Sequence, residues 1–315
     1  MNLKDARRLW KAIYDEKQEE KVMIVPEYYE DLSVLHDGTM MPRAYYVPAS
    51  KRMNDPVECR EDSDRMQMLN GNWKFRYYNS IYDVQDEFFA LGYDTSKFDR
   101  VKVPGVWQMS GYDSHQYTNI RYPFPFDPPY IPQDIPCGAY VHFFDYKRDE
   151  EAPKAYLNFE GVDSCFYVWL NGSYTGYSQV SHAVSEFDIT SKLVEGRNTI
   201  AVLVLKWCDG SYLEDQDKFR MSGIFRDVYL LKRPEESVRD YRVRTVLNEN
   251  RAEANVSFSY LGHPVSTDVI LYDHEDRCVA SGRVKEDTVS LEVLNPVLWS
   301  PENPYLYTLV ITTEG

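Results

Sequence analysis

Cysteine, histidine and the common catalytic signatures are scarce in this sequence. It has five cysteines in 315 residues, with no CxxC pair and no metal-ligand spacing, and the odd number argues against a full disulfide framework. We therefore expect reduced thiols, with Cys165 and Cys208 buried inside apolar runs. The six histidines share no spacing with a second ligand, which argues against a zinc site. The GxSxG, GxGxxG and phosphate-loop signatures are also absent.

Long apolar runs and excess positive charge are missing as well. No run approaches the roughly 18 apolar residues of a membrane-spanning helix. The first twenty residues lack the apolar stretch of a secretory signal, so we expect no membrane association and a cytoplasmic location. Thirty-five basic residues stand against 50 acidic ones, a formal charge of -15. This charge argues against nucleic acid as a partner.

What is present predicts a folded, all-β chain. The sequence is 43% hydrophobic and 15% aromatic, enough to bury a core, and its length suggests about two domains. Short strand-like runs separated by turns follow residue 138; they are AYVHFFDY, AYLNFE, CFYVWLN, SYTGY and NTIAVLVLKW. Asn171-Gly172 between two of these runs favours a type I′ hairpin. In CFYVWLN both alternating faces are apolar, which indicates stacked sheets, as in a sandwich or jelly roll.

A proline-rich stretch interrupts this pattern. Six of the 17 prolines fall between Pro123 and Pro136, a density that excludes regular structure and predicts a stiff surface loop. Long ordered loops are often functional. The loop also carries aromatic side chains, which suit either packing or the apolar faces of sugars; they are Tyr117, Tyr122, Phe124, Phe126 and Tyr130.

Three regions are expected along the chain. Residues 1–60 should form an N-terminal helix, at residues 3–14, followed by an extended arm. Residues 61–234 should form a jelly-roll sandwich, and residues 235–315 an incomplete immunoglobulin-like sandwich that lacks a strand. Because the sequence stops where a hairpin would turn, we expect it to be part of a longer polypeptide.

The densest polar cluster is WCDGSYLEDQDKFRMSG. It contains Asp209, Glu214, Asp215 and Asp217, followed by Lys218 and Arg220. Four carboxylates this close repel one another unless arginines, backbone amides or a cation hold them. Their spacing does not match an EF-hand loop, and nothing in it establishes the paired carboxyl groups of a glycosidase. Solvated or internally paired carboxylates therefore remain an alternative to a binding site.

Three long stretches together resemble the N-terminal part of family-2 glycoside hydrolases, in the form found in large bacterial β-galactosidases. They are VPGVWQMSGYDSHQYTNIRYPFPFDPPYIP, FEGVDSCFYVWLNGSYTGYSQVSHAVSEFDIT and LKWCDGSYLEDQDKFRMSGIFRDVYLL. FEGVDS, WLNG and GIFRDV are typical of the whole family, whereas YTNIRYP and DGSYLEDQD point to galactosidases. The similarity runs from Met66 to the end of the chain and is strongest up to Leu231.

The resemblance implies a sugar-binding jelly roll and an immunoglobulin-like domain that precede a catalytic (β/α)₈ barrel. It places the catalytic glutamates and the magnesium ligands of the full-length enzyme in that barrel, with no counterpart here, so no catalytic residue is expected and this piece alone should be inactive. Asn119 resembles a residue that reaches into the galactose pocket. Asp209 resembles one that contacts substrate and helps to bind a sodium ion. Glu214, Asp215, Asp217, Arg220 and Arg226 are assigned to loop scaffolding and to the interface with the barrel.

The function that follows is a non-catalytic contribution to a retaining β-galactosidase, which hydrolyses terminal β-D-galactosides such as lactose. The expected partners are the β-galactoside and the protein's own barrel, and the family suggests a homo-oligomer in which residues 1–50 support subunit association. Two alternatives remain open: a freestanding carbohydrate-binding module without catalysis, and a purely structural domain.

Overall fold

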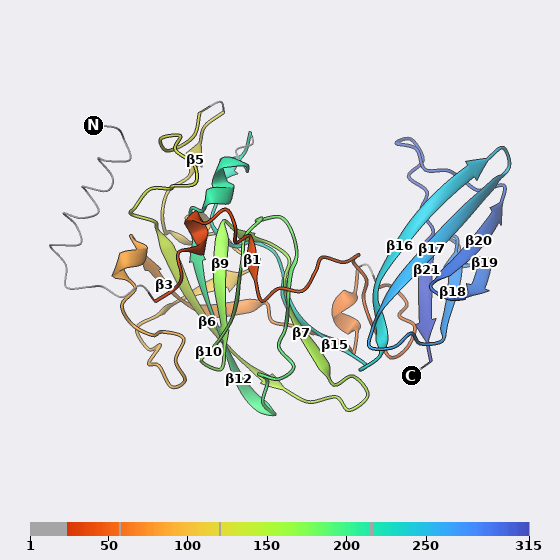
Figure 1. The fold of residues 1–315 in the computed structure, drawn as a ribbon, viewed down its shortest axis with the longest axis horizontal. Coiled ribbons are helices and arrows are strands. Elements are labelled where there is room, and N and C mark those ends of the chain that lie inside the picture. Colours follow the sequence, from red (N-terminus) through yellow and green to blue (C-terminus); the bar gives the residue numbers. More distant parts are fainter. Residues whose placement is uncertain (1–23, 57, 120, 215–216, 315) are drawn as a thin grey trace. The chain divides into compact units, whose positions relative to one another are not determined.

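The computed structural model describes residues 24–56, 58–119, 121–214 and 217–314 and is built almost entirely from β-strands (Figure 1). The all-β prediction is confirmed. The helix predicted at residues 3–14 lies outside the described residues. Within the described part of the chain, no helix has the length and apolar character needed to cross a bilayer.

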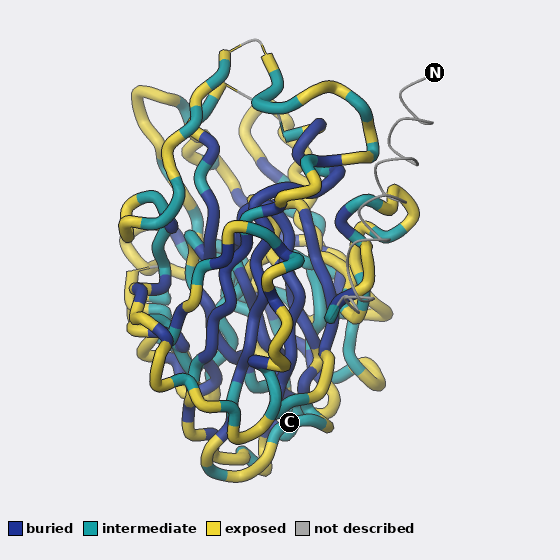
Figure 2. Tube along the Cα trace, turned by 90° about the vertical axis from the view of Figure 1, so that its left-hand side faces the viewer, coloured by how far each residue is buried: buried dark blue, intermediate teal, exposed yellow. Residues whose placement is uncertain are grey.

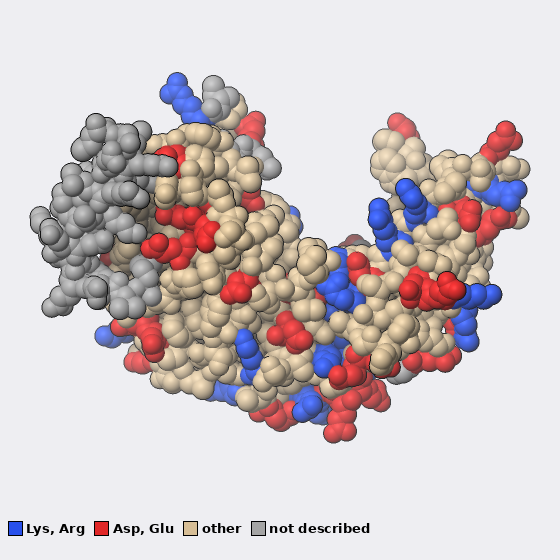
Figure 3. Space-filling view, in the orientation of Figure 1, with Lys and Arg blue, Asp and Glu red and all other residues tan. Residues whose placement is uncertain are grey.

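The described chain separates into two compact units. The first takes residues 24–40, 68–147 and 157–229, and the second takes residues 41–67, 148–156 and 230–314. On the face drawn in Figure 3, basic and acidic side chains are interspersed on each unit. That face shows no continuous basic stripe of the kind that a phosphate backbone would need.

Two sheets contain most of the strands between residues 36 and 233. A seven-stranded sheet has the order β1 (His36–Asp37), β10 (Ser173–Ser178), β9 (Cys165–Leu170), β12 (Gly196–Leu205), β6 (Cys137–Tyr146), β3 (Gly71–Tyr78) and β4 (Asp99–Val103). A four-stranded sheet has the order β11 (Ser185–Asp188), β7 (Lys154–Phe159), β15 (Val228–Arg233) and β2 (Met66–Met68). The strand runs read from the sequence coincide with β6, β7, β9, β10 and β12.

The hairpin between β9 and β10 forms where the sequence predicts it. Asn171 and Gly172 both have positive φ, 50° and 79°. This is the backbone that a two-residue type I′ turn requires, and Asn and Gly adopt it at low cost. The turn fixes the pairing of Leu170 with Ser173.

Both faces of β9 are covered, as its sequence pattern predicts. On one face Phe166 packs against Phe159 of β7, with ring centroids 4.9 Å apart, and against Phe187 of β11 at 6.2 Å. On the other face Trp169 stacks on Phe89 at 4.6 Å. Each side chain of this kind, fully buried, stabilises the fold by about 2–3 kcal/mol. Figure 2 shows buried segments in the interior, enclosed by more exposed loops.

The proline-rich stretch has no regular structure from residue 121 to residue 136, as predicted. It is less superficial than expected, because Ile131 and Ile135 are 1% and 2% exposed and belong to the core beneath the seven-stranded sheet. The prolines fix the path of the segment, and these two isoleucines anchor it.

Short elements connect the sheets. Two small ladders pair β5 (Gln116–Tyr117) with β13 (Phe219–Arg220) and β8 (Val162–Asp163) with β14 (Gly223–Ile224). The 3₁₀ helices are η1 (Tyr28–Glu30), η2 (Arg60–Asp62), η3 (Ile81–Asp83), η4 (Trp107–Ser110) and η5 (Asp209–Tyr212). The first ladder and η5 position the candidate site described below.

In the second unit, two three-stranded sheets enclose a small core. They have the orders β16 (Ser237–Asn248), β17 (Arg251–Leu261), β20 (Thr288–Leu294) and β19 (Cys278–Arg283), β18 (Thr267–Tyr272), β21 (Thr308–Thr313). Their shared core is centred on Val256, Phe258, Val269 and Leu291. The arm lies along β16, where the Tyr46 hydroxyl donates to the Val238 carbonyl at 2.9 Å and the Ala44 amide donates to Asp240 at 2.7 Å.

Candidate functional site

Asp209 stands at the start of η5, a single turn with a defined cap. Cys208 before it has extended backbone, and its amide donates to the hydroxyl of Ser211 at 3.1 Å. The Cys208 side chain in turn accepts from the amide of Ser211, which completes a capping box. The turn follows directly on the buried end of β12, so the sheet fixes the position of Asp209.

The Asp209 carboxylate is only 6% exposed. Its Oδ1 accepts from the Gly210 backbone amide at 2.8 Å, and a hydrogen bond from the Gln179 side chain also favours the ionised carboxylate. Burial nevertheless raises the pKa of Asp209, which the two hydrogen bonds only partly offset. A buried carboxylate of this kind gains from a cation that approaches it.

Gln179 holds this carboxylate in place. The side chain is 2% exposed; its Nε2 donates to the Val34 carbonyl at 3.3 Å, and its Oε1 lies 3.5 Å from the Cys208 Sγ. A Cβ at position 210 would lie 2.5 Å from that Oε1, so any larger residue there would displace the Gln179 side chain. The sequence reasoning did not identify Gln179, since a lone glutamine carries no motif.

Asn119 follows the strand β5 and is exposed. β5 pairs with β13, so that Tyr117 lies opposite Phe219, with ring centroids 5.6 Å apart. The Tyr117 hydroxyl donates to Asp217, and this bond raises the pKa of Tyr117. Asn119 therefore sits two residues beyond a strand that is fixed to the segment following η5.

The other side of Asn119 is tied to η5 itself. The Tyr122 hydroxyl donates to the Tyr212 carbonyl at 3.1 Å. Tyr212, the last residue of η5, also packs with the rings of Tyr122, Phe124 and Phe126 at centroid distances of 5.5, 5.3 and 5.4 Å. The loop that carries Asn119 is thus joined to η5 on one side of Asn119 and to the segment that follows η5 on the other, although no direct contact links the side chains of Asn119 and Asp209.

Most aromatic side chains of the proline-rich stretch serve this attachment. The Tyr212 hydroxyl donates to the Tyr130 carbonyl and accepts from the Asp127 amide, which lies 3.2 Å away. Packing, one of the two interpretations left open by the sequence, accounts for Tyr122 and Phe124, whereas Phe126 contacts Tyr212 but remains 66% exposed. Tyr117 and Phe219 remain 51% and 58% exposed and form an aromatic pair at the surface.

The other charged residues of the acidic segment act as scaffolding. Glu214 accepts from the Ser181 amide at 2.9 Å and from its hydroxyl at 2.7 Å. The Arg220 guanidinium donates to the Glu214 carbonyl at 3.0 Å, and Arg226 donates to the His182 carbonyl at 3.2 Å. The Ser181 amide and hydroxyl hold the carboxylate of Glu214, and the Tyr117 hydroxyl donates to that of Asp217. Asp215 lies outside the described residues.

The described carboxylates near Asp209 do not make a three-ligand metal site by themselves. Among the residues that the structure describes, no three His, Cys, Asp or Glu side chains are grouped as a metal site. As a hard oxygen donor, the Asp209 carboxylate could supply one ligand to a sodium ion. The remaining ligands would come from elsewhere.

A second buried carboxyl, Asp163 in β8, was missed by the sequence reasoning. Its carboxylate accepts from the Ser164 hydroxyl at 2.7 Å and lies 3.9 Å from the Lys218 ammonium. Burial raises the pKa of Asp163 to about 6. The signal in the sequence was an acid inside the apolar stretch FEGVDSCF, where a carboxylate needs partners.

Comparisons with known proteins agree on the family of both halves. Residues 66–234 match the family model described as "Glycosyl hydrolases family 2, sugar binding domain", and residues 236–315 match "Glycosyl hydrolases family 2". The chain is 44% identical over 296 residues to a β-galactosidase of Staphylococcus xylosus and 42% identical over 294 residues to one of Actinobacillus pleuropneumoniae. These alignments cover 93% and 92% of the chain but only 29% and 28% of the relatives.

Solved structures show the same fold. A β-glucuronidase from an uncultured Clostridium species superposes with a TM-score of 0.63 at 23% identity, over 80% of this chain and 44% of that one. A β-glucuronidase from Ruminococcus gnavus gives a TM-score of 0.62 at 21% identity, over 79% of this chain and 42% of that one.

Proposed function

The chain belongs to family 2 of the glycosyl hydrolases, and from this premise we propose that it forms one wall of a galactoside-binding cleft in a retaining β-galactosidase. The bond-breaking carboxylates would stand on a catalytic barrel of the same protein. The observation that carries the proposal is the attachment of the Asn119 loop to η5 on one side of Asn119 and to the segment that follows η5 on the other.

Asn119 and Asp209 would act on the substrate in different ways. The exposed amide of Asn119 can both donate to and accept from sugar hydroxyls. The Asp209 carboxylate can accept from a hydroxyl and can also serve as one ligand of a sodium ion. Magnesium would be bound by the barrel, where it would assist the chemistry of bond cleavage. The chain alone would then bind weakly and hydrolyse nothing, because two suitably separated carboxyl groups are needed for cleavage.

Galactoside specificity is supported by the relatives. The two proteins that share 44% and 42% identity with the chain are β-galactosidases, whereas the glucuronidases are similar at the level of the fold. The chain spans less than a third of those galactosidases, so the activity of the whole protein belongs to the proposal. A cytoplasmic location and assembly into a homo-oligomer also belong to it.

The test is substitution of Asp209 by Asn or Ala in the polypeptide that includes the barrel. We expect a raised KM for β-galactosides and a weaker response of the rate to added sodium chloride, compared with potassium chloride at equal ionic strength. Asp188→Asn is the matched control, since Asp188 is an exposed carboxylate of the same unit that accepts from the Thr190 amide at 3.0 Å. Kinetics of both Asp209 variants that match the control would overturn the proposal.

A freestanding sugar-binding module is the second candidate, favoured by the family model, which describes a sugar-binding domain. Calorimetry of this chain with galactose and lactose separates the two. Clear affinity without any barrel, lost in Asn119→Ala, supports the module. No affinity of this chain for either sugar, together with altered kinetics of the Asp209 variants in the longer polypeptide, supports the cleft wall. No effect in either experiment indicates a purely structural domain.

A further inference from the structure

A buried ion pair joins the two segments that carry the proposed sugar-binding residues. Lys206 lies three positions before Asp209, and Asp113 lies six positions before Asn119. The Lys206 Nζ is 2.5 Å from the Asp113 Oδ2, and the two side chains are only 4% and 11% exposed. The contact spans 93 positions of sequence and lies within the first unit.

Each partner is held by further contacts. The Gln108 Nε2 donates to the same Asp113 Oδ2 at 3.0 Å, while the Gln108 Oε1 accepts from the Ser222 amide at 3.1 Å. Asp113 has a positive φ of 57°, which is typical of a turn. Aspartate tolerates this conformation better than most residues.

The lysine end is equally fixed. The Lys206 amide donates to the Pro136 carbonyl at 2.9 Å, and its carbonyl accepts from the Ser164 hydroxyl at 2.8 Å. Its Nζ also lies 5.2 Å from the centroid of the Trp207 ring, within the range of a cation–π contact. Backbone and side chain of Lys206 are therefore both anchored, and the Asp113 turn is attached to this anchor.

We propose that Asp113 and Lys206 are a positioning pair that sets the Asn119 loop against the Asp209 turn. Their effect on the sugar rests on the function proposed above, but the coupling of the two segments does not. Replacing a buried ion pair by apolar groups is often neutral for stability, whereas removing one partner leaves a buried charge. We therefore assign to this pair the positioning of the two segments, in addition to any contribution to the free energy of unfolding.

The pair predicts coupled changes in two segments distant in sequence. Amide hydrogen exchange of this chain measures them at residues 114–119 and 209–213. Lys206→Met and Asp113→Asn should each reduce protection in both segments by about tenfold or more. The double variant should lose no more than either single variant, because the first substitution already breaks the contact. Amides of β16 and β17 in the second unit are the internal control.

Rescue by Lys206→Arg separates positioning from a general loss of packing. The guanidinium keeps the charge and can donate to Asp113, so protection in both segments should stay within about twofold of the wild type. If Lys206→Met and Asp113→Asn do not fold, the milder Asp113→Glu still tests the idea, because its longer side chain displaces the carboxylate from Lys206 and should lower protection in both segments together. Exchange that changes only in the mutated segment, or additively in the double variant, overturns the positioning role.

Kinetics of the longer polypeptide tell the two proposals apart. Asp113→Asn should raise KM for a β-galactoside more than it lowers kcat, and should add little to the effect of Asn119→Ala. Coupled exchange with unchanged kinetics in Asn119→Ala and Asp209→Ala leaves the positioning pair in place and removes the sugar-binding function. Altered kinetics in Asn119→Ala and Asp209→Ala without coupled exchange supports the sugar-binding function and removes the positioning pair.

Discussion

The carboxylate of Asp163 lies 3.9 Å from the ammonium of Lys218, yet its pKa is raised to about 6 rather than lowered. Burial is the largest cause, and the nearby carboxylate of Glu214 adds to it. Lys218, Arg220 and the Ser164 hydroxyl act in the opposite direction. Desolvation outweighs these partners, so the ionised form of Asp163 is held at a cost in stability.

The first prediction is a pH dependence that Asp163→Asn removes. Because the folded-state pKa lies above the unfolded value of 3.8, the native state binds the proton more tightly, and stability falls as pH rises from about 4 to about 6. Between pH 5 and pH 8 the free energy of unfolding should fall by about 1 kcal/mol for a pKa shift of this size. Urea denaturation followed by tryptophan fluorescence measures it. If the free energies of unfolding of the wild type and Asp163→Asn differ by the same amount at pH 5 and at pH 8, the raised pKa is contradicted.

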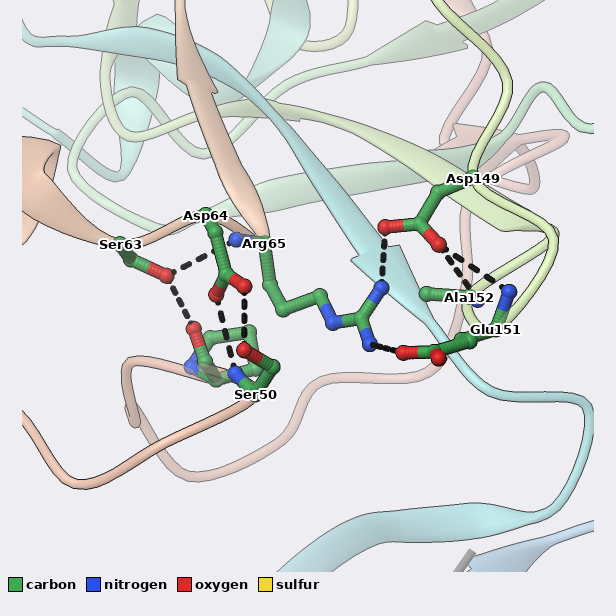
Figure 4. Close-up of polar contacts among 8 residues, drawn as sticks. Ser50, Ser63, Asp64, Arg65, Asp149, Glu151 and Ala152 are labelled. Carbon is green, nitrogen blue, oxygen red and sulfur yellow. Dashed lines mark hydrogen bonds and ion pairs between the residues drawn. The ribbon is translucent and has the colours of Figure 1, made fainter.

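Arg65 provides the second prediction. Its guanidinium contacts the carboxylates of Asp149 and Glu151, and its side chain is 9% exposed (Figure 4). Asp149 also accepts from the amides of Glu151 and Ala152, at 3.0 and 3.2 Å. Arg65→Met removes the charge while keeping an apolar stem, and leaves Asp149 without its cation.

We expect Arg65→Met to lower the free energy of unfolding by about 2–3 kcal/mol, less than for a fully buried pair because Asp149 is 27% exposed. Glu151→Gln is the control, since Glu151 is 84% exposed and its ion pair should contribute less than about 1 kcal/mol. Equal effects of the two substitutions in urea denaturation would show that the Asp149 contact is not the important one.

The third prediction concerns Gly210. An alanine there would bring its Cβ to 2.5 Å from the Gln179 Oε1, so Gly210→Ala should destabilise by about 1–3 kcal/mol through overpacking. Gln179→Ala removes the obstructing atom at the expense of its hydrogen bonds. The double variant should therefore be less destabilised than the sum of the single ones. A double-mutant cycle of unfolding free energies measures this coupling, and simple additivity would rule out the steric explanation.

Some parts of this molecule could be predicted from sequence and others could not, for a physical reason. The hairpin at Asn171-Gly172 is local, because two adjacent residues supply the positive φ angles that the turn needs. Alternation within CFYVWLN likewise reveals both buried faces of β9. The composition of the Asp209 segment identified a polar site, but not which partners hold it. These partners lie far away in the sequence. Ser181, for example, is 33 positions from Glu214, and the two become neighbours only through the sheet topology.

The arm gives the fourth prediction, which concerns assembly. We propose that residues 1–23 support subunit association, whereas residues 24–50 are needed by their own chain, because β1 belongs to the seven-stranded sheet and Ala44 and Tyr46 bond to β16. Removing residues 1–23 from the longer polypeptide should lower its mass in light scattering and leave both units folded. Removing residues 1–50 should also destabilise both units. An unchanged mass after either deletion would remove the proposed role in assembly.

Tyr212 yields the last prediction, on the loop that carries Asn119. Tyr212→Phe keeps the ring contacts with Phe124 and Phe126 but removes the hydroxyl that bonds to Tyr130 and Asp127. Losing these two contacts should cost about 1–2 kcal/mol of local stability, because a donor and an acceptor lose their partner.

Limited proteolysis detects that loss directly. Chymotrypsin should cut Tyr212→Phe in the segment from residue 124 to residue 130 several-fold faster than the wild type, since cleavage follows the local opening equilibrium. Tyr93→Phe is the matched control, because it removes a hydroxyl that bonds at 3.2 Å to an exposed carboxylate, Asp86, outside this loop. Cleavage of the loop at the wild-type rate in Tyr212→Phe would mean that the packed rings alone hold it, and that the hydroxyl of Tyr212 does not help to place Asn119.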